Sequence, residues 1–216
     1  MNTTFPLFYT KHISKTRRLA PLFVAIAFLN GCAIAPPAVE NADWSRHKDQ
    51  LEQLSSWQRR GRVNVRYDNE AHTPRIQWQQ NEAQYNIRLW GTFNVGSTTI
   101  EGRPGFVTLE QDGEELSAAS PEELILQQLG YELPVSSLEH WIKGIPAPES
   151  TAELQFSEFN QLTQLVQDGW TVIFDDLRQY GEFSLPRRVE LTRPKNDIRL
   201  RFIGISWTIP TEPSTN

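Results

Sequence analysis

The chain has 216 residues, with 21 Lys and Arg against 26 Asp and Glu, a formal net charge of −5 and a single cysteine. This length supports one good hydrophobic core and predicts a single domain. The acidic balance argues against a nucleic-acid or anionic-lipid binding protein, and one cysteine excludes an internal disulfide.

Residues 1–31 have the layout of a secretory signal peptide. Four basic residues and no acidic residue precede the apolar run from Leu19 to Leu29, and small residues flank Cys32 directly after it. The run is shorter than the roughly 20 residues that span a bilayer. The position of Cys32 resembles a bacterial lipobox, in which cleavage leaves the cysteine N-terminal and acylated. The alternatives are a membrane helix, or a secretory signal with an incidental cysteine.

The chain after Gly31 keeps 17 of its 21 basic residues and all 26 acidic ones, so it is too acidic for charge to hold it to a membrane. Membrane attachment is therefore expected to come from acyl chains on Cys32. The residue directly after Cys32 is Ala33 and not an aspartate. By analogy with other lipoproteins, this favours sorting to the outer membrane, with the protein facing the periplasm. The expected organisation is a lipoprotein signal peptide (1–31), a lipidated tether (32–42), one domain (43–210) and a tail (211–216).

Three helices are predicted. Residues 43–58 place apolar side chains on one face, with Asp43 as the expected N-cap. Residues 121–129 follow a capping box that begins at Ser120, and a glycine comes directly after them. Residues 136–139 repeat the capping-box pattern and predict the start of a third helix.

The remainder of the chain predicts roughly ten to eleven short antiparallel strands, so the expected fold class is mainly β with inserted helices (α+β). Apolar and polar residues alternate in short runs that are separated by Gly, Asn and Asp. These runs lie at 63–67, 76–78, 85–89, 107–109, 154–156, 162–166, 170–174, 189–191, 198–202 and 205–209.

Motifs for catalysis, metal or nucleotide binding are not found in the sequence. It has no phosphate-binding glycine loop and no nucleophile elbow, and His47, His72 and His140 lack metal-ligand spacing. The sequence therefore predicts a binding or carrier protein without cofactor or metal, rather than an enzyme. The charged run 59–62 predicts a solvated face.

The segment from Trp90 to Thr98 joins two predicted strands and combines turn residues with apolar ones. Apolar side chains at a turn tip, such as Phe93 and Val95, indicate contact with a partner or membrane. The alternative is that Phe93 and Val95 fold back onto the core.

Spaced motifs across the whole predicted domain resemble the LolB family of outer-membrane lipoproteins, and the segment 133–146 is the most specific of them. The matching positions are Trp57, Gly61-Arg62, Asn94–Ser97, Pro121–Leu124, Leu129-Gly130, Leu133–Pro146, Gln167–Trp170 and Leu185-Pro186. The resemblance implies an incomplete antiparallel β-barrel with a helical lid over an apolar cavity. In this family an exposed leucine after a proline is thought to enter the membrane. Here Val95 follows Asn94, and Phe93 and Trp90 are expected to assist.

The resemblance implies an outer-membrane-anchored acceptor that receives lipoproteins from a soluble, LolA-like periplasmic carrier. It would insert them into the outer membrane down an affinity gradient, as a monomer and without nucleotide. The predicted acyl-chain cavity comprises Trp78, Tyr85, Ile87, Leu89, Trp170, Val172, Phe174, Leu200 and Phe202, and the predicted lid comprises Leu124, Leu138, Trp141 and Ile142. Periodicity does not separate a lined cavity from a filled core. The alternative function is a structural or assembly lipoprotein that binds a protein partner by a sheet edge.

Overall fold

The structure, a computed structural model, describes residues 42–91, 96–130 and 132–210, which belong to one compact unit. The predicted signal peptide, Cys32, most of the tether and the tail lie outside them. The helices are α1 (Ala42–Gln53), α2 (Pro121–Leu129), α3 (Val135–Trp141) and the short 3-10 helix η1 (Pro194–Asn196). The strands are β1 (Ser56–Tyr67), β2 (Glu70–His72), β3 (Arg75–Asn81), β4 (Gln84–Trp90), β5 (Thr98–Arg103), β6 (Phe106–Gln111), β7 (Glu114–Ala118), β8 (Glu153–Phe156), β9 (Leu162–Gln167), β10 (Trp170–Tyr180), β11 (Phe183–Arg193) and β12 (Ile198–Thr208).

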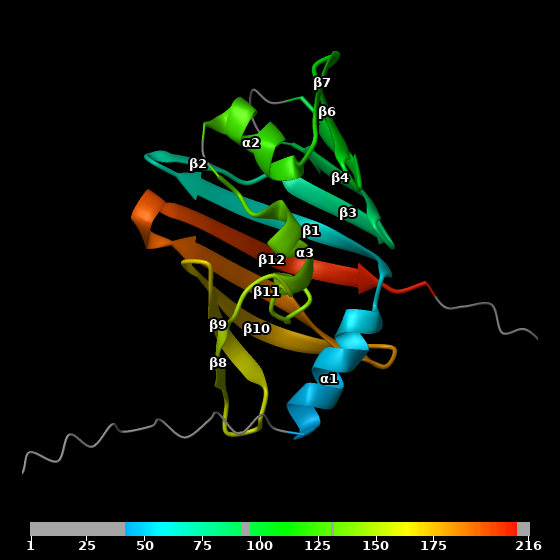
Figure 1. The fold of residues 1–216 in the computed structure, drawn as a ribbon, viewed down its shortest axis with the longest axis vertical. Helices are drawn as coiled ribbons and strands as arrows, with labels where there is room; N and C mark the ends of the chain where they lie inside the picture. The colour runs from blue at the N-terminus through cyan, green and yellow to red at the C-terminus, as the bar shows by residue number, and fades with distance from the viewer. Residues whose placement is uncertain (1–41, 92–95, 131, 211–216) are drawn as a thin grey trace, which may run out of the picture. The chain divides into compact units, whose positions relative to one another are not determined.

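All strands belong to one antiparallel sheet in the order β7-β6-β5-β4-β3-β1-β12-β11-β10-β9-β8, and β2 pairs with β1. β1 and β12 are neighbours in the middle, whereas β7 and β8 end the sheet and do not pair with each other in the described chain. Helices α2 and α3 connect β7 to β8, and all three α-helices lie in front of one face of the sheet (Figure 1). The predicted incomplete barrel with inserted helices is confirmed.

The described sheet has twelve strands, against the ten to eleven predicted. Three described strands, β2, β5 and β7, are not among the predicted runs. Nearly all side chains of β2 and β7 are exposed, and β5 has Ile100 as its one large apolar residue, so none of the three shows the apolar alternation. Conversely, the runs 198–202 and 205–209 are a single strand, β12. The sequence splits this strand in two because the alternation changes phase between the runs.

A β-bulge causes that change of phase. The pairing between β1 and β12 shifts at Gly61, and Gly204 on β12 has a left-handed φ of 61°. As a result Phe202 and Ile205, an odd number of residues apart, are both buried. A Cβ on Gly61 would lie 2.4 Å from Cδ1 of Ile205 and 3.0 Å from the carbonyl oxygen of Ile203, so a side chain here would press on the backbone of β12 as well as on Ile205.

Helix α2 begins and ends as predicted. The Ser120 side chain accepts a hydrogen bond from the backbone N–H of Glu123 (3.2 Å), and Glu123 accepts one from the N–H of Ala119 (3.2 Å). Gly130 takes a left-handed φ of 74° and donates to the carbonyl of Leu126. Local sequence signals therefore decide both ends of this helix.

The predicted limits of the other two helices are wrong. α3 begins at Val135 after Pro134, without a side-chain cap, and the predicted capping residue Ser136 lies inside it. The N–H of Ser136 donates instead to the Glu122 carboxylate of α2 (2.8 Å), so a neighbouring helix replaces the local cap. α1 starts at Ala42 and ends at Gln53, five residues before its predicted end, because the chain turns there into β1.

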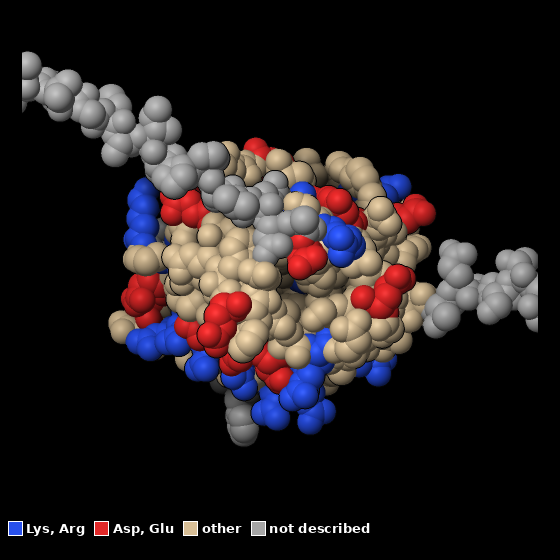
Figure 2. Space-filling model, turned by 90° about the horizontal axis from the view of Figure 1, so that it is seen from below, with Lys and Arg blue, Asp and Glu red and all other residues tan. Residues whose placement is uncertain are grey.

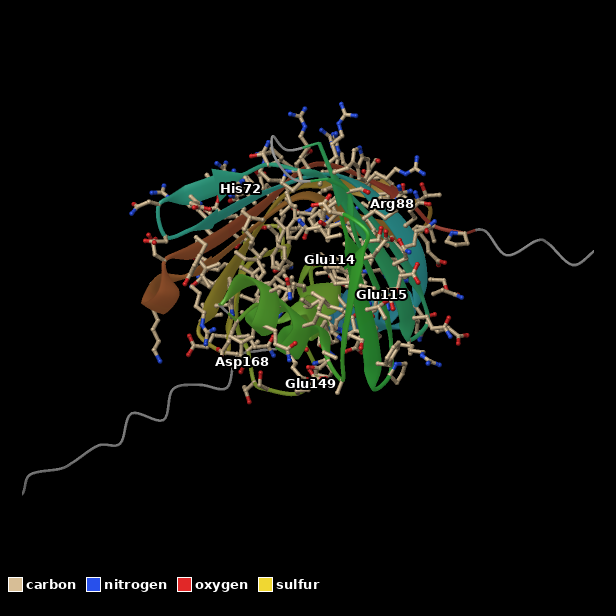
Figure 3. The ribbon with its side chains drawn as sticks, turned by 90° about the horizontal axis from the view of Figure 1, so that it is seen from above. His72, Arg88, Glu114, Glu115, Glu149 and Asp168 are labelled. Atoms are coloured by element: carbon tan, nitrogen blue, oxygen red, sulfur yellow. The ribbon has the colours of Figure 1, made fainter. Side chains whose placement is uncertain are left out.

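The two faces of the curved sheet differ in character, and the helices lie on its inner, concave side (Figure 3). The inner face is apolar and packs with the helices into one core. The outer face carries exposed arginines from neighbouring strands, including Arg62, Arg75 and Arg88. Lys and Arg side chains gather along the lower margin of Figure 2, which is the side of this face. The apolar side chains of the sheet therefore lie mainly on the inner face, which the helices cover.

Candidate functional site

The inner face brings together all nine predicted cavity residues. Trp78, Ile87, Trp170, Val172, Phe174, Leu200 and Phe202 are buried, and Tyr85 and Leu89 are partly buried against the same cluster. The predicted lid residues Leu124, Leu138, Trp141 and Ile142 are also buried there. Trp141 of α3 packs on Trp170 with ring centroids 6.2 Å apart. This burial fits both a filled core and a closed cavity, so the acyl-binding role of these residues stays a prediction.

Two pockets reach between the helices and the inner face. One, of about 300 Å³, lies near the starts of α2 and α3 and includes Trp78, Tyr85, Val135 and Glu139. The other, of about 220 Å³, is bordered by α1, β10 and β11 and includes Phe174. An apolar cavity of about 150 Å³ holds one benzene molecule. Each pocket therefore has room for a short hydrocarbon segment, and several acyl chains would require the helices to move.

A third hollow, of about 960 Å³, opens at one end of the barrel. The end of α1, the β3–β4 turn, the β10–β11 hairpin and the end of β12 frame it, and these elements lie toward the right in Figure 1. Its apolar lining includes Leu54, Phe183, Trp207 and Ile209. The hollow lies at the opposite end of β4 from the predicted membrane turn.

Arg59 belongs to the charged run 59–62, for which a solvated face is predicted, and this prediction is wrong for Arg59. Its side chain is fully buried, and its guanidinium lies over the rings of Phe202 (4.6 Å) and Trp207 (5.1 Å). Burial lowers the pKa of Arg59 to about 9, which leaves it charged at neutral pH. Arg59 lies two residues after Trp57 on the same strand, and residues at this spacing point to the same face of a sheet. The position relative to Trp57 therefore predicts the orientation of Arg59 better than its place in a charged run does.

Lys143 is a second buried cation on this side of the sheet. Its ammonium donates to the carbonyl of Leu54 (3.3 Å), which ties the segment after α3 to the end of α1. Burial lowers the pKa of Lys143, and Glu139 and Glu52 act in the opposite direction. Burial also raises the pKa of Glu139, while Lys143 opposes that shift. His140 is half-buried, and burial lowers its pKa.

Gln167 holds α3 and the following loop against the sheet, whereas the sequence identifies it only as part of the matching motif Gln167–Trp170. Its Oε1 accepts from the Trp141 indole (2.7 Å) and from the N–H of Ala147 (2.9 Å). Its Nε2 donates to the carbonyls of Ala147 and Ser150, both at 2.8 Å. A buried amide with both ends satisfied acts as a latch that holds α3 to the sheet.

The predicted membrane turn is described only at its edges. Trp90 is half-buried at the end of β4, opposite Arg75 on β3. Phe93 and Val95 lie outside the described residues. Within the described ranges, no helix has the length and apolarity needed to cross a membrane, and no cluster of His, Cys, Asp and Glu is suited to a metal ion.

Solved structures of other proteins share this fold at very low sequence identity. A DUF1329 family protein from Desulfovibrio piger matches 77% of this chain and 89% of its own, with a TM-score of 0.51 and 7% identity. A putative outer membrane lipoprotein-sorting protein domain from Vibrio parahaemolyticus matches 80% and 93%, with a TM-score of 0.50 and 8% identity. These likenesses concern the fold alone.

Sequence comparison gives the family. The outer-membrane lipoprotein LolB of Chromohalobacter salexigens is 32% identical over 211 residues, 92% of this chain and 98% of its own length. The protein of the same description from Pseudomonas fluorescens is 38% identical over 186 residues, 83% of this chain and 91% of its own. The family model described as outer membrane lipoprotein LolB matches residues 55–207, and the chain therefore belongs to the LolB family.

Proposed function

We propose that this protein is an outer-membrane acceptor that takes lipoproteins from a soluble, LolA-like carrier and passes them into the outer membrane. Its membership of the LolB family supports this role. The observation that carries the proposal is the continuous apolar inner face beneath three helices, which offers acyl chains a surface away from water. The function is non-catalytic transport by a monomer that Cys32 anchors through acyl chains.

An affinity gradient drives the transfer. Each buried methylene is worth about 0.8 kcal/mol, so one sixteen-carbon chain is worth about 12 kcal/mol. The carrier and the acceptor must each bury the acyl chains well enough to supply most of this stabilisation outside the membrane. In the absence of a nucleotide site in the sequence, transfer runs forward only if each successive host binds the chains more tightly.

Loading requires the lid to separate from the sheet. Helix α3 packs on the inner face through Leu138 and Trp141, and Gln167 fixes the loop that follows it. Moving this part of the chain outward would expose Trp170 and its neighbours to an incoming acyl chain. The buried side chains of the closed arrangement would then become the walls of an open cavity.

The first expected result concerns the predicted membrane turn. Val95→Glu should leave folding intact and reduce insertion of a client lipoprotein into membranes by about a hundredfold. The reason is that a charge in the apolar bilayer costs about 3 kcal/mol. Recovery of client with outer-membrane vesicles, starting from the carrier-bound form, measures this. Val95→Leu is the control and should deliver normally. Unchanged delivery by Val95→Glu would remove the turn from the mechanism.

A second result separates acyl binding from a scaffold that pairs by a sheet edge. The edge strand β7 carries Glu114 and Glu115 (Figure 3), and charges on an edge disfavour addition of another strand. We therefore expect saturable uptake of a fluorescent fatty acid by a soluble Cys32→Ala form, competed by unlabelled hexadecanoate. Absence of uptake, together with capture of a strand peptide by β7 or β8, would favour the scaffold.

A further inference from the structure

Building on the function proposed above, we propose that Arg59 is a binding residue for the carbonyl oxygens of acyl esters and amides. These are the groups that join acyl chains to a lipoprotein. In the closed arrangement the guanidinium lacks an acceptor, and in the loaded protein the ligand provides one. Arg59 thereby gives the cavity a polar anchor beside its apolar walls.

The position of Arg59 suits such an anchor. It lies in the central part of the sheet, paired with Trp78 of β3 on one side and Trp207 of β12 on the other. The rings of Phe202 and Trp207 hold the guanidinium by cation–π contact at 4.6 and 5.1 Å. These contacts fix the planar group among apolar side chains but satisfy none of its N–H donors.

Among the described side chains, Arg59 leaves the most buried polar atoms without a partner, whereas Trp44, Trp57, Tyr85 and Arg199 each leave one. Nε and both terminal nitrogens of Arg59 are buried, and none has a hydrogen-bond acceptor in the described part of the chain. The buried side chains of Lys143 and Gln167, by contrast, hydrogen-bond to backbone carbonyls. A buried donor without an acceptor is costly, and a buried charge more so. An acceptor brought by a ligand would remove this cost.

A route to the guanidinium starts at the barrel-end hollow. Trp207 lines that hollow, and the same indole ring contacts Arg59. The guanidinium therefore lies one side chain beneath a surface opening of about 960 Å³. Leu54, at the end of α1, lines the hollow as well, so a shift of α1 or of the Trp207 ring would expose the N–H groups.

The residues around Arg59 indicate which kind of hydrogen-bond acceptor a ligand would bring to it. The residues beside Arg59 are aromatic, which suits the first methylenes of an acyl chain and leaves the guanidinium as the hydrogen-bond donor for the group at the head of that chain. An ester or amide carbonyl accepts well from a charged donor, whereas an ether oxygen accepts poorly. A hydrogen bond to the carbonyl would add to the stabilisation from acyl-chain burial. This protein would then bind its cargo more tightly than a host whose cavity is purely apolar.

The test compares two ligands that differ only in this group. One is a diacylglyceryl-cysteine peptide with two sixteen-carbon ester chains, and the other is its twin with two sixteen-carbon ether chains. For the Cys32→Ala chain, we expect the ester to bind about ten- to a hundredfold more tightly, the range for a hydrogen bond to a charged group. Arg59→Met should bring the two affinities together while keeping binding of the ether.

The matched control is Arg60→Met, the same change on the neighbouring, exposed residue of the outer face, and it should keep the preference for the ester. Equal binding of ester and ether by the wild-type chain would overturn the inference, without need of a variant. A preference that persists in Arg59→Met would overturn it too. A stronger effect of Arg59→Met on free hexadecanoate than on the ester would assign the residue to a carboxylate instead. Binding of neither peptide would overturn the proposed function itself.

Discussion

Replacing Gln167 with leucine is expected to lower the free energy of unfolding by about 4 kcal/mol or more. The change removes partners from the Trp141 indole, from both backbone groups of Ala147 and from the carbonyl of Ser150. Each buried group left without a partner costs about 1–3 kcal/mol. Thermal unfolding should show a midpoint about 8–16 °C lower, and amide exchange should accelerate first in residues 135–150.

Gln164→Leu is the matched control because Gln164 lies on the same strand, β9, and is not fully buried. Its effect should stay within about 0.5 kcal/mol. If Gln167→Leu unfolded like the wild-type chain, the buried amide would not be the latch that holds α3 to the sheet.

Arg59→Met is expected to have the opposite sign and to raise the free energy of unfolding by about 1–4 kcal/mol. Burial of the charged Arg59 guanidinium carries a desolvation cost, which also lowers its pKa. Cation–π contact with two rings offsets about 2 kcal/mol of this cost. Methionine keeps a long apolar side chain in this space, so chemical denaturation should show a higher midpoint.

The pH dependence of this gain follows from the direction of the pKa shift. Below about pH 9 the guanidinium is charged in both the folded and the unfolded chain, so the gain should be constant between pH 6 and 8. Above about pH 9 the unfolded chain binds more protons than the folded one, wild-type stability rises, and the gain should shrink. A variant less stable than the wild type would mean that the aromatic contacts outweigh desolvation. A stability gain combined with loss of ester preference would mark Arg59 as a residue kept for binding.

Elements that depend on neighbouring residues can be predicted from the amino-acid sequence. The Ser120 cap, Pro121 and Gly130 define α2 through hydrogen bonds within a few residues, and the structure has the same limits. Strict alternation of apolar residues placed most strands and their inward faces, because a half-buried sheet imposes a period of two. The spaced motifs also identified the family.

Features that depend on residues distant in the chain become visible only in the folded protein. The start of α3 depends on Glu122 from another helix, and the phase change within β12 depends on its pairing with Gly61. Gln167 becomes a latch only because the fold brings Trp141 beside it, and Arg59 loses water only because other strands and helices surround it. Hydrogen bonding and desolvation between distant segments are set by packing, whereas caps, turns and periodicity are encoded in neighbouring residues.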